Sequence, residues 1–174
     1  GGKGSYANVV EALGHLDLSP AKGKRVLLKP NAGRLAVPGT GICTSPEAVA
    51  ACIDVFKEAG AVVAVGESPI TGVKTHEAFE LTGIAEVARK RDVALIDMDE
   101  RKFFPVAIDG TAIQSLKLCP EMEEYDIYVS IPVMKTHMHT GVTLGVKNMK
   151  GCLWRRSKVD LHMLPEIEGH DEKP

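Results

Sequence analysis

The chain has 174 residues, of which 44% are hydrophobic and 25% are charged, and its formal net charge is −2. This composition excludes a disordered chain and allows one domain with a substantial core, which we expect to span residues 1–174. The balanced charge gives no reason to expect a nucleic-acid partner, and no apolar run approaches the roughly 20 residues of a membrane span.

Four cysteines (Cys43, Cys52, Cys119 and Cys152) are scattered without a C-x-x-C pair. This spacing is typical neither of a ferredoxin-type iron–sulfur motif nor of a structural zinc site. Two disulfides are arithmetically open, but free thiols in a reducing compartment are the simpler interpretation and favour the cytoplasm. The first residues contain no starting Met and no leader with an apolar core, so export with a removed leader stays open.

Apolar runs alternate with helical patterns along the chain. An amphipathic helix is expected from Ser5, and Thr44-Ser-Pro-Glu47 begins another, with either Ser45 or Thr44 as N-cap. Cys52 lies on the apolar face of this second helix, which predicts a core thiol. The later helices are expected over 75–81 and 84–91, and the buried strands over 24–29, 61–65, 93–97 and 127–133.

Residues 103–108 predict a further strand, which Pro105 restricts to an edge position. Asp109-Gly110 then predicts a hairpin turn into residues 111–116. Together these patterns predict an α/β fold: a mainly parallel, mixed sheet with flanking helices and a β-hairpin insertion near residues 103–117.

Polar segments follow three of the predicted strands, at residues 29–31, 66–68 and 135–150. In parallel sheets the functional loops lie beyond the carboxyl ends of the strands, so we expect these three segments to converge. From Lys135 to Val159 there are six Lys or Arg residues and no Asp or Glu. Such a segment can hold an anion, although a solvated basic loop is the plainer alternative.

The candidate residues divide by chemistry. Lysine side chains can bind a carboxylate or phosphate, and backbone N–H groups near Gly141 can help if a helix begins near Val142. His137 and His139 can transfer protons, with Lys147 as a third catalytic candidate. The expected ligand-binding residues are Lys29, Asn31, Glu67, Ser68, Lys135, Thr136, Gly141, Thr143, Asn148 and Lys150. Asn31, Glu67 and Ser68 could equally form ordinary turns.

A metal site is an alternative use of the histidines. His137 and His162 are the candidate ligands, with Cys152, Glu67 and Asp160 as further donors. No spacing matches a standard zinc motif. Cys152 lies among basic residues, so its thiol would have a lowered pKa if it were exposed.

Several motifs together resemble the domain-of-unknown-function 362 family, from about residue 5 to residue 162. They are Val26-Leu-Leu-Lys-Pro-Asn31, Thr44-Ser-Pro-Glu47, Gly66-Glu-Ser-Pro69 and Lys135-Thr-His…Thr140-Gly-Val-Thr-Leu…Lys147-Asn…Lys150-Gly151. Members are often fused to, or encoded with, ferredoxin-type iron–sulfur modules, and the activity of the family is not settled. The resemblance implies that an iron–sulfur cluster would come from a partner or a missing module. Family domains usually continue further, so residues 163–174 could be a cut edge.

A weaker similarity is to nickel-pincer lactate racemases, in which a catalytic His precedes a cofactor-bearing Lys and a metal-binding His follows. Here His137 precedes Lys147 by ten positions, and His162 follows Lys147 by fifteen. This similarity implies nickel or another transition metal as a cofactor.

The leading expectation is an α/β enzyme domain that binds an anionic small molecule or cofactor and is redox-linked through an iron–sulfur partner. One alternative is a metal-dependent racemase or isomerase. The other is a non-enzymatic domain whose basic loop docks an acidic, ferredoxin-like protein.

Overall fold

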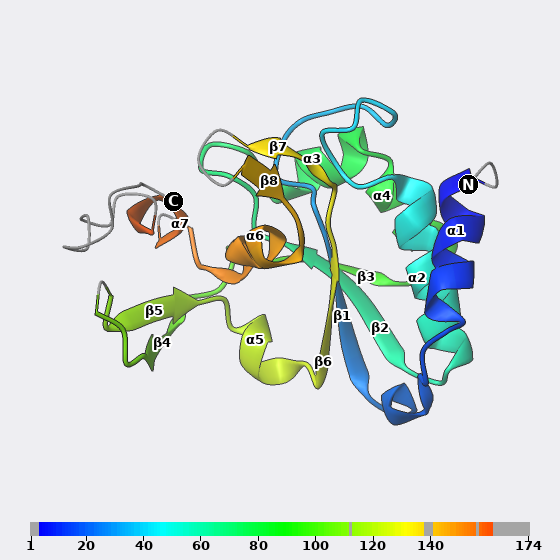
Figure 1. The fold of residues 1–174 in the computed structure, drawn as a ribbon, viewed down its shortest axis with the longest axis horizontal. Helices are drawn as coiled ribbons and strands as arrows, with labels where there is room; N and C mark the ends of the chain where they lie inside the picture. Colours follow the sequence, from blue (N-terminus) through cyan, green and yellow to red (C-terminus); the bar gives the residue numbers. More distant parts are fainter. Residues whose placement is uncertain (1–3, 112, 138–140, 156, 162–174) are drawn as a thin grey trace.

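The computed structural model describes residues 4–111, 113–137, 141–155 and 157–161 (Figure 1). Its centre is a sheet of four parallel strands in the order β3-β2-β1-β6. The bounds of these strands are Arg25–Pro30 for β1, Val62–Glu67 for β2, Ala94–Asp97 for β3 and Ile127–Ile131 for β6. All four lie at the predicted positions, and the α/β fold class is confirmed.

Four helices cover one face of this sheet: α1 (Gly4–Leu13), α2 (Pro46–Glu58), α3 (Thr75–Leu81) and α4 (Ile84–Lys90). The short helix η1 (Ser19–Ala21) leads into β1. Val26 and Leu28 point to this face and pack with Ile53, Phe79 and other buried side chains. Helix α2 has Ser45 as N-cap and Pro46 as its first residue, and its Cys52 is buried as predicted.

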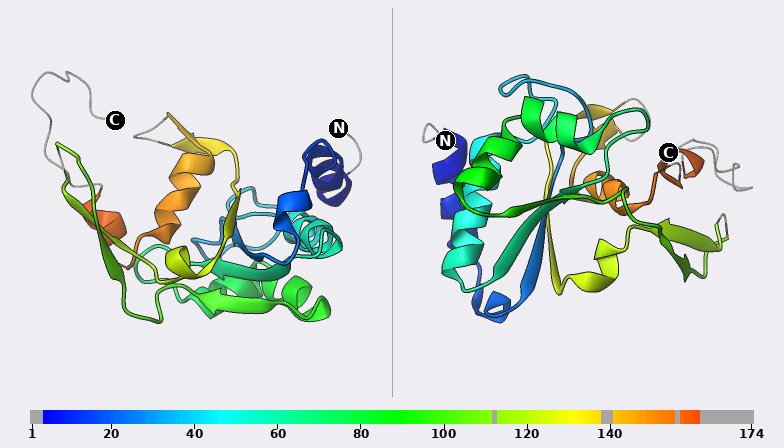
Figure 2. Two further views of the ribbon diagram at one scale, coloured as in Figure 1. Left: turned by 90° about the horizontal axis from the view of Figure 1, so that it is seen from below. Right: turned by 180° about the vertical axis from the view of Figure 1, so that it is seen from behind.

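The opposite face of the sheet carries no comparable layer of long helices in the described ranges (Figure 2). Leu27, Ala64 and Met98 pack there against Cys119 and Cys152. Strands β4 (Phe104–Ala107) and β5 (Ser115–Leu118) form the predicted hairpin, followed by α5 (Glu121–Glu124). The second hairpin strand begins at Ser115 rather than near residue 111, and the hairpin is a separate antiparallel sheet.

The basic segment after β6 is more structured than a loop. It contains β7 (Lys135–His137), β8 (Gly141–Thr143), α6 (Gly145–Met149), η2 (Lys150–Cys152) and α7 (Ser157–Asp160). No helix begins at Val142 itself, because Val142 pairs with Thr136 in the β7–β8 hairpin. The helix begins only at Gly145, after the hairpin pairing ends.

The topological switch point of the sheet lies at β1, where the chain changes the direction in which it adds strands. The chain leaves β1 through α2 on one face and reaches β2, and it returns across the other face to β6 on the other side of β1. Ligands of open α/β sheets bind beyond the carboxyl ends of strands at such a point. The loops after β1 and β6 therefore occupy the position in which this architecture places a site. No helix of the described part is long and apolar enough to cross a membrane.

Candidate functional site

A buried ion pair joins the ends of β1 and β2. Lys29 Nζ lies 2.6 Å from Glu67 Oε1, and both side chains are at most 3% exposed. The Glu67 carboxylate also accepts the backbone N–H groups of Ala32 and Ser68, at 2.9 Å each. Both carboxylate oxygens are thus bonded, and the first residues of two loops are fixed by one buried charge.

Asn148 brings the third polar segment to this pair. Its side-chain oxygen accepts from Lys29 Nζ at 3.4 Å, and its Nδ2 donates to the Lys29 carbonyl and to Ser130 Oγ, at 3.0 Å each. Because Ser130 belongs to β6, this one amide connects α6 to two neighbouring strands. The predicted convergence of residues 29–31, 66–68 and 135–150 is therefore present in these contacts.

Glycine at position 151 allows the segment to lie directly on the ion pair. A Cβ atom at Gly151 would lie 2.5 Å from Glu67 Oε1 and 2.5 Å from Lys29 Cε. Neither neighbour can move away without breaking the buried bonds described above. Gly151 was only part of a family motif in the sequence, since nothing in its local pattern shows which side chains it faces.

A second polar cluster lies beside the first. Lys158 Nζ donates to Ser68 Oγ, lies 3.0 Å from the Leu153 carbonyl oxygen and 3.3 Å from Asp99 Oδ2. Ser68 is 2% exposed, so its hydroxyl is held inside the cluster rather than presented to solvent. Sequence reasoning singled out neither Asp99 nor Lys158 for this contact, because they are 59 positions apart and no spacing signal connects them.

The β7–β8 hairpin directs Lys135 and Thr143 inwards. Lys135 Nζ donates to the Ile42 carbonyl at 2.6 Å and lies 3.4 Å from Asn31 Oδ1, so it joins the loop after β1. Burial lowers the pKa of Lys135 below its usual value. Thr143 is paired with Lys135 across the hairpin and is buried, and its hydroxyl has no hydrogen-bond partner among the described residues.

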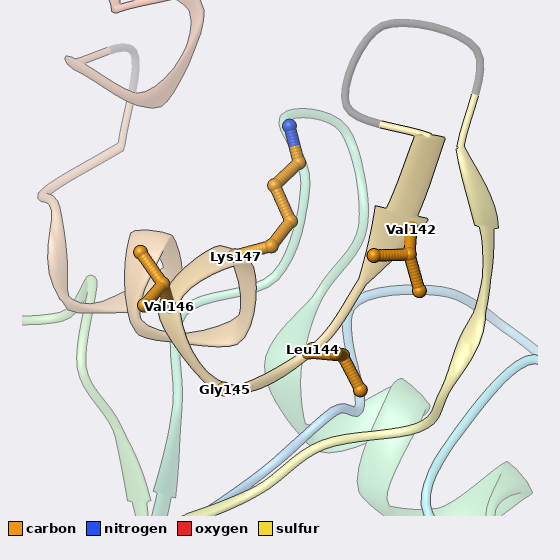
Figure 3. A pocket seen from close by; sticks show the side chains of 5 residues that line it. All are labelled: Val142, Leu144, Gly145, Val146 and Lys147. Carbon is orange, nitrogen blue, oxygen red and sulfur yellow. The ribbon is translucent and has the colours of Figure 1, made fainter.

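Lys147 and Lys150 differ from Lys29 and Lys158, which form ion pairs with carboxylates. Both are partly buried, and neither forms an ion pair with an Asp or Glu of the described part of the chain. Burial lowers the pKa of Lys147. Burial, and then the charges of Lys147 and Lys158, lower the pKa of Lys150 to about 8. Figure 3 shows the Lys147 side chain rising from α6 beside the hairpin.

Three further candidates lie on the β7–β8 hairpin. His137 is a partly buried residue of β7, Thr136 is exposed on the same strand, and Gly141 has a φ of +67° at the start of β8. His139 and His162 lie outside the described residues. Within the described ranges no three His, Cys, Asp or Glu side chains gather as a metal site.

Cys152 does not have the exposure on which its predicted reactivity depended. It is 4% exposed in the core beneath the sheet, and burial raises the pKa of its thiol to about 11. Its backbone carbonyl accepts the N–H of Cys119, so the two cysteines lie opposite each other across a short antiparallel contact. The neighbouring basic residues therefore do not lower the pKa of this thiol enough to ionise it, and the thiol is protonated at neutral pH.

The Lys29–Glu67 pair gives a first prediction. Lys29→Met leaves the Glu67 charge buried without its partner, and we expect the free energy of unfolding to fall by about 3–5 kcal/mol. Lys74→Met is the matched control, because Lys74 and Glu77 form a 2.8 Å pair that is exposed and should contribute less than about 1 kcal/mol. Urea unfolding measures both, and equal effects would contradict a structural role for the buried pair.

Gly151 gives a second prediction. Gly151→Ala should lower the free energy of unfolding by about 1–3 kcal/mol, because the added methyl group overpacks the buried pair. Gly145→Ala tests the same change where no atom lies within 4 Å of the new Cβ, and it should leave stability unchanged. Thermal unfolding of the two variants distinguishes crowding from a general intolerance of α6 and η2 to alanine.

Comparison with known proteins identifies the family of this chain. The family model described as "Domain of unknown function (DUF362)" matches residues 26–170. The chain is also similar to thylakoid-associated protein sll1697 of Synechocystis sp., with 31% identity over 159 residues. That alignment covers 91% of this chain and 48% of the relative, so the chain spans about half the length of that protein. No solved structure matches the chain. Because the family model covers most of the chain, this protein belongs to the DUF362 family.

Proposed function

We propose that this domain binds an anionic small molecule or cofactor at the carboxyl edge of its sheet, with Lys147 and Lys150 as the principal cations. The observation that carries the proposal is the missing counter-charge of these two partly buried lysines in the described part of the chain. A pKa lowered by burial and by like charges means that the charged form of Lys150 is disfavoured. A bound carboxylate or phosphate would supply the opposite charge.

The other candidates take supporting roles in this proposal. Lys29 bonds to both Glu67 and Asn148, so these three residues hold the loops in place, and other residues contact the ligand. Lys135 and Asn31 form the side of the site that faces the loop after β1. The Thr143 hydroxyl, which has no hydrogen-bond partner among the described residues, can donate to a ligand oxygen. His137 or His139 would transfer a proton if the ligand is a substrate.

The resemblance to proteins encoded with ferredoxin-type modules extends the proposal to a redox role with an iron–sulfur partner. A cytoplasmic location is part of the same proposal, and it is supported by the four free cysteines. A metal-dependent racemase using His137, Lys147 and His162 remains a separate proposal, which metal analysis of natively purified protein would test. Docking of an acidic, ferredoxin-like protein without turnover is the non-enzymatic alternative.

A second candidate function is attachment to a membrane surface. It is supported by the similar protein from Synechocystis, which is described as thylakoid-associated. Attachment and anion binding are compatible, because a membrane surface can itself present phosphate groups.

Anion binding is tested by calorimetric titration of the folded chain with pyrophosphate and with a dicarboxylate. Lys147→Met and Lys150→Met should each weaken binding at least about tenfold, because a charge-assisted hydrogen bond contributes about 1.5–3 kcal/mol. Lys90→Met is the control, since Lys90 is exposed on α4 and pairs with Glu86. Affinity of the unmodified chain should fall as pH rises through about 8, where Lys150 loses its proton. Unchanged affinity in both lysine variants would refute the proposal.

The same lysine should reduce stability at neutral pH. The pKa of Lys150 is about 8 in the folded chain and 10.5 as the ordinary value, so the unfolded chain holds more protons between these pH values. Stability of the unmodified chain therefore rises with pH across this window. Lys150→Met removes the disfavoured charge, so its melting temperature should exceed that of the unmodified chain by a few degrees at pH 7. The difference should shrink towards pH 10.5, whereas Lys90→Met should show no such gain. A pH-independent difference would contradict this origin.

A further inference from the structure

The outer face of the β7–β8 hairpin is apolar and exposed. Lys135 pairs with Thr143, so the preceding residue, Met134, lies opposite Leu144, and Val142 follows on the same side. Met134 is 77% exposed, and Val142 and Leu144 are 43% and 44% exposed. Lys135 and Thr143 thus point inwards, whereas Met134, Val142 and Leu144 point outwards together with the exposed Thr136, so most of the outer side chains are aliphatic, unlike those of an ordinary surface hairpin.

Helix α6 extends this apolar face. Val146 is 92% exposed, and with Val142, Leu144, Gly145 and Lys147 it lines an open hollow of about 450 Å³ (Figure 3). Lys147 is the charged residue of this otherwise apolar lining. Lys150 follows one turn later and also lacks an acidic partner within the described ranges. Aliphatic side chains and uncompensated cations therefore share one surface.

The loop after β1 exposes further aliphatic side chains at the same end of the sheet. Leu35, Val37 and Ile42 are between 40% and 53% exposed, and the Ile42 carbonyl accepts the hydrogen bond from Lys135. Figure 1 shows this loop beside the β7–β8 hairpin, at the end opposite to η1. The carboxyl edge of the sheet is thus bordered by exposed aliphatic residues on two sides.

We propose that this face, formed by Met134, Val142, Leu144 and Val146 with Lys147 and Lys150 beside them, docks on an anionic lipid surface. The aliphatic side chains enter the layer of lipid headgroups, and the lysines contact lipid phosphates. The inference deepens the membrane attachment proposed above by naming the surface that performs it, and it rests on that proposed function.

The residue types favour a lipid surface over a protein partner. Protein interfaces are enriched in aromatic residues, Met and Arg and depleted in Lys, and of the enriched types this face has only Met134. This face has Val, Leu, Met and Lys, a combination that suits interfacial membrane binding, in which apolar side chains are buried and lysines are attracted to anionic headgroups. Neither lysine of the face is neutralised by an acidic residue of the described chain, so the attraction to anionic lipid is not opposed locally.

Vesicle co-sedimentation tests the proposal. The chain should bind vesicles of phosphatidylglycerol at low salt at least about tenfold more tightly than vesicles of phosphatidylcholine, and binding should weaken as salt rises. The double variant Met134→Ser, Val146→Ser should reduce binding at least about tenfold, since two exposed apolar side chains are lost. The matched control is Leu16→Ser, Val62→Ser, which changes side chains that are 60% and 64% exposed at the opposite end of the sheet.

The outcomes separate the surface from the functions proposed above. Vesicle binding that survives Met134→Ser, Val146→Ser, or that is lost equally in the control, overturns the assignment of this face but not membrane attachment. No binding of the unmodified chain to any vesicle overturns both, while pyrophosphate titration shows whether the anion site persists. A concentration-dependent dimer that the double variant disperses, without vesicle binding, would assign the face to a second copy and reject the lipid. Circular dichroism establishes that each variant is folded.

Discussion

The arrangement of the site depends on one buried charge pair, Lys29 with Glu67. Removing two charges from water is costly, and the cost is offset only when the pair has close geometry and its remaining polar atoms are bonded. Here the Glu67 carboxylate takes two backbone N–H groups, and Lys29 bonds to Asn148 and to the Pro30 carbonyl. These contacts bring three segments of the chain together at the ion pair. They also explain why position 151, which lies directly on the pair, is a glycine.

The lysines of the same region consequently divide into two groups. Lys29, Lys135 and Lys158 are bonded to atoms of the chain and hold its loops together. Lys147 and Lys150 have no acidic partner in the described ranges, and burial lowers the pKa of both, with like charges adding to the effect at Lys150. Uncompensated charge at the carboxyl edge of a parallel sheet reduces stability, and such local costs are characteristic of sites that bind ligands.

Different kinds of element cover the two faces of the sheet, and this difference determines which side chains remain exposed. Long helices α1 and α2 pack on one face, whereas short elements and the β4–β5 hairpin cover the other. The segment after β6 must cross this second face and still reach the switch point beside β1. Met149 and Cys152 cover part of this second face, while the β7–β8 hairpin leaves its outer side chains exposed, so the anion site and the apolar face arise from the same short stretch of chain.

The sequence alone determined the alternation of strands and helices, because buried parallel strands are continuous apolar runs and α2 has a clear Ser-Pro start. It also located the three polar segments, since each follows a strand directly. Tertiary structure decided which residues face one another: the Glu67 carboxylate meets Lys29, Lys158 reaches Asp99, and Cys152 is buried. Val142 lies in the β7–β8 hairpin, and the helix begins three residues later, at Gly145. Contacts between residues far apart in the chain leave no periodic signal, so local patterns could not reveal the partners that fix each charge.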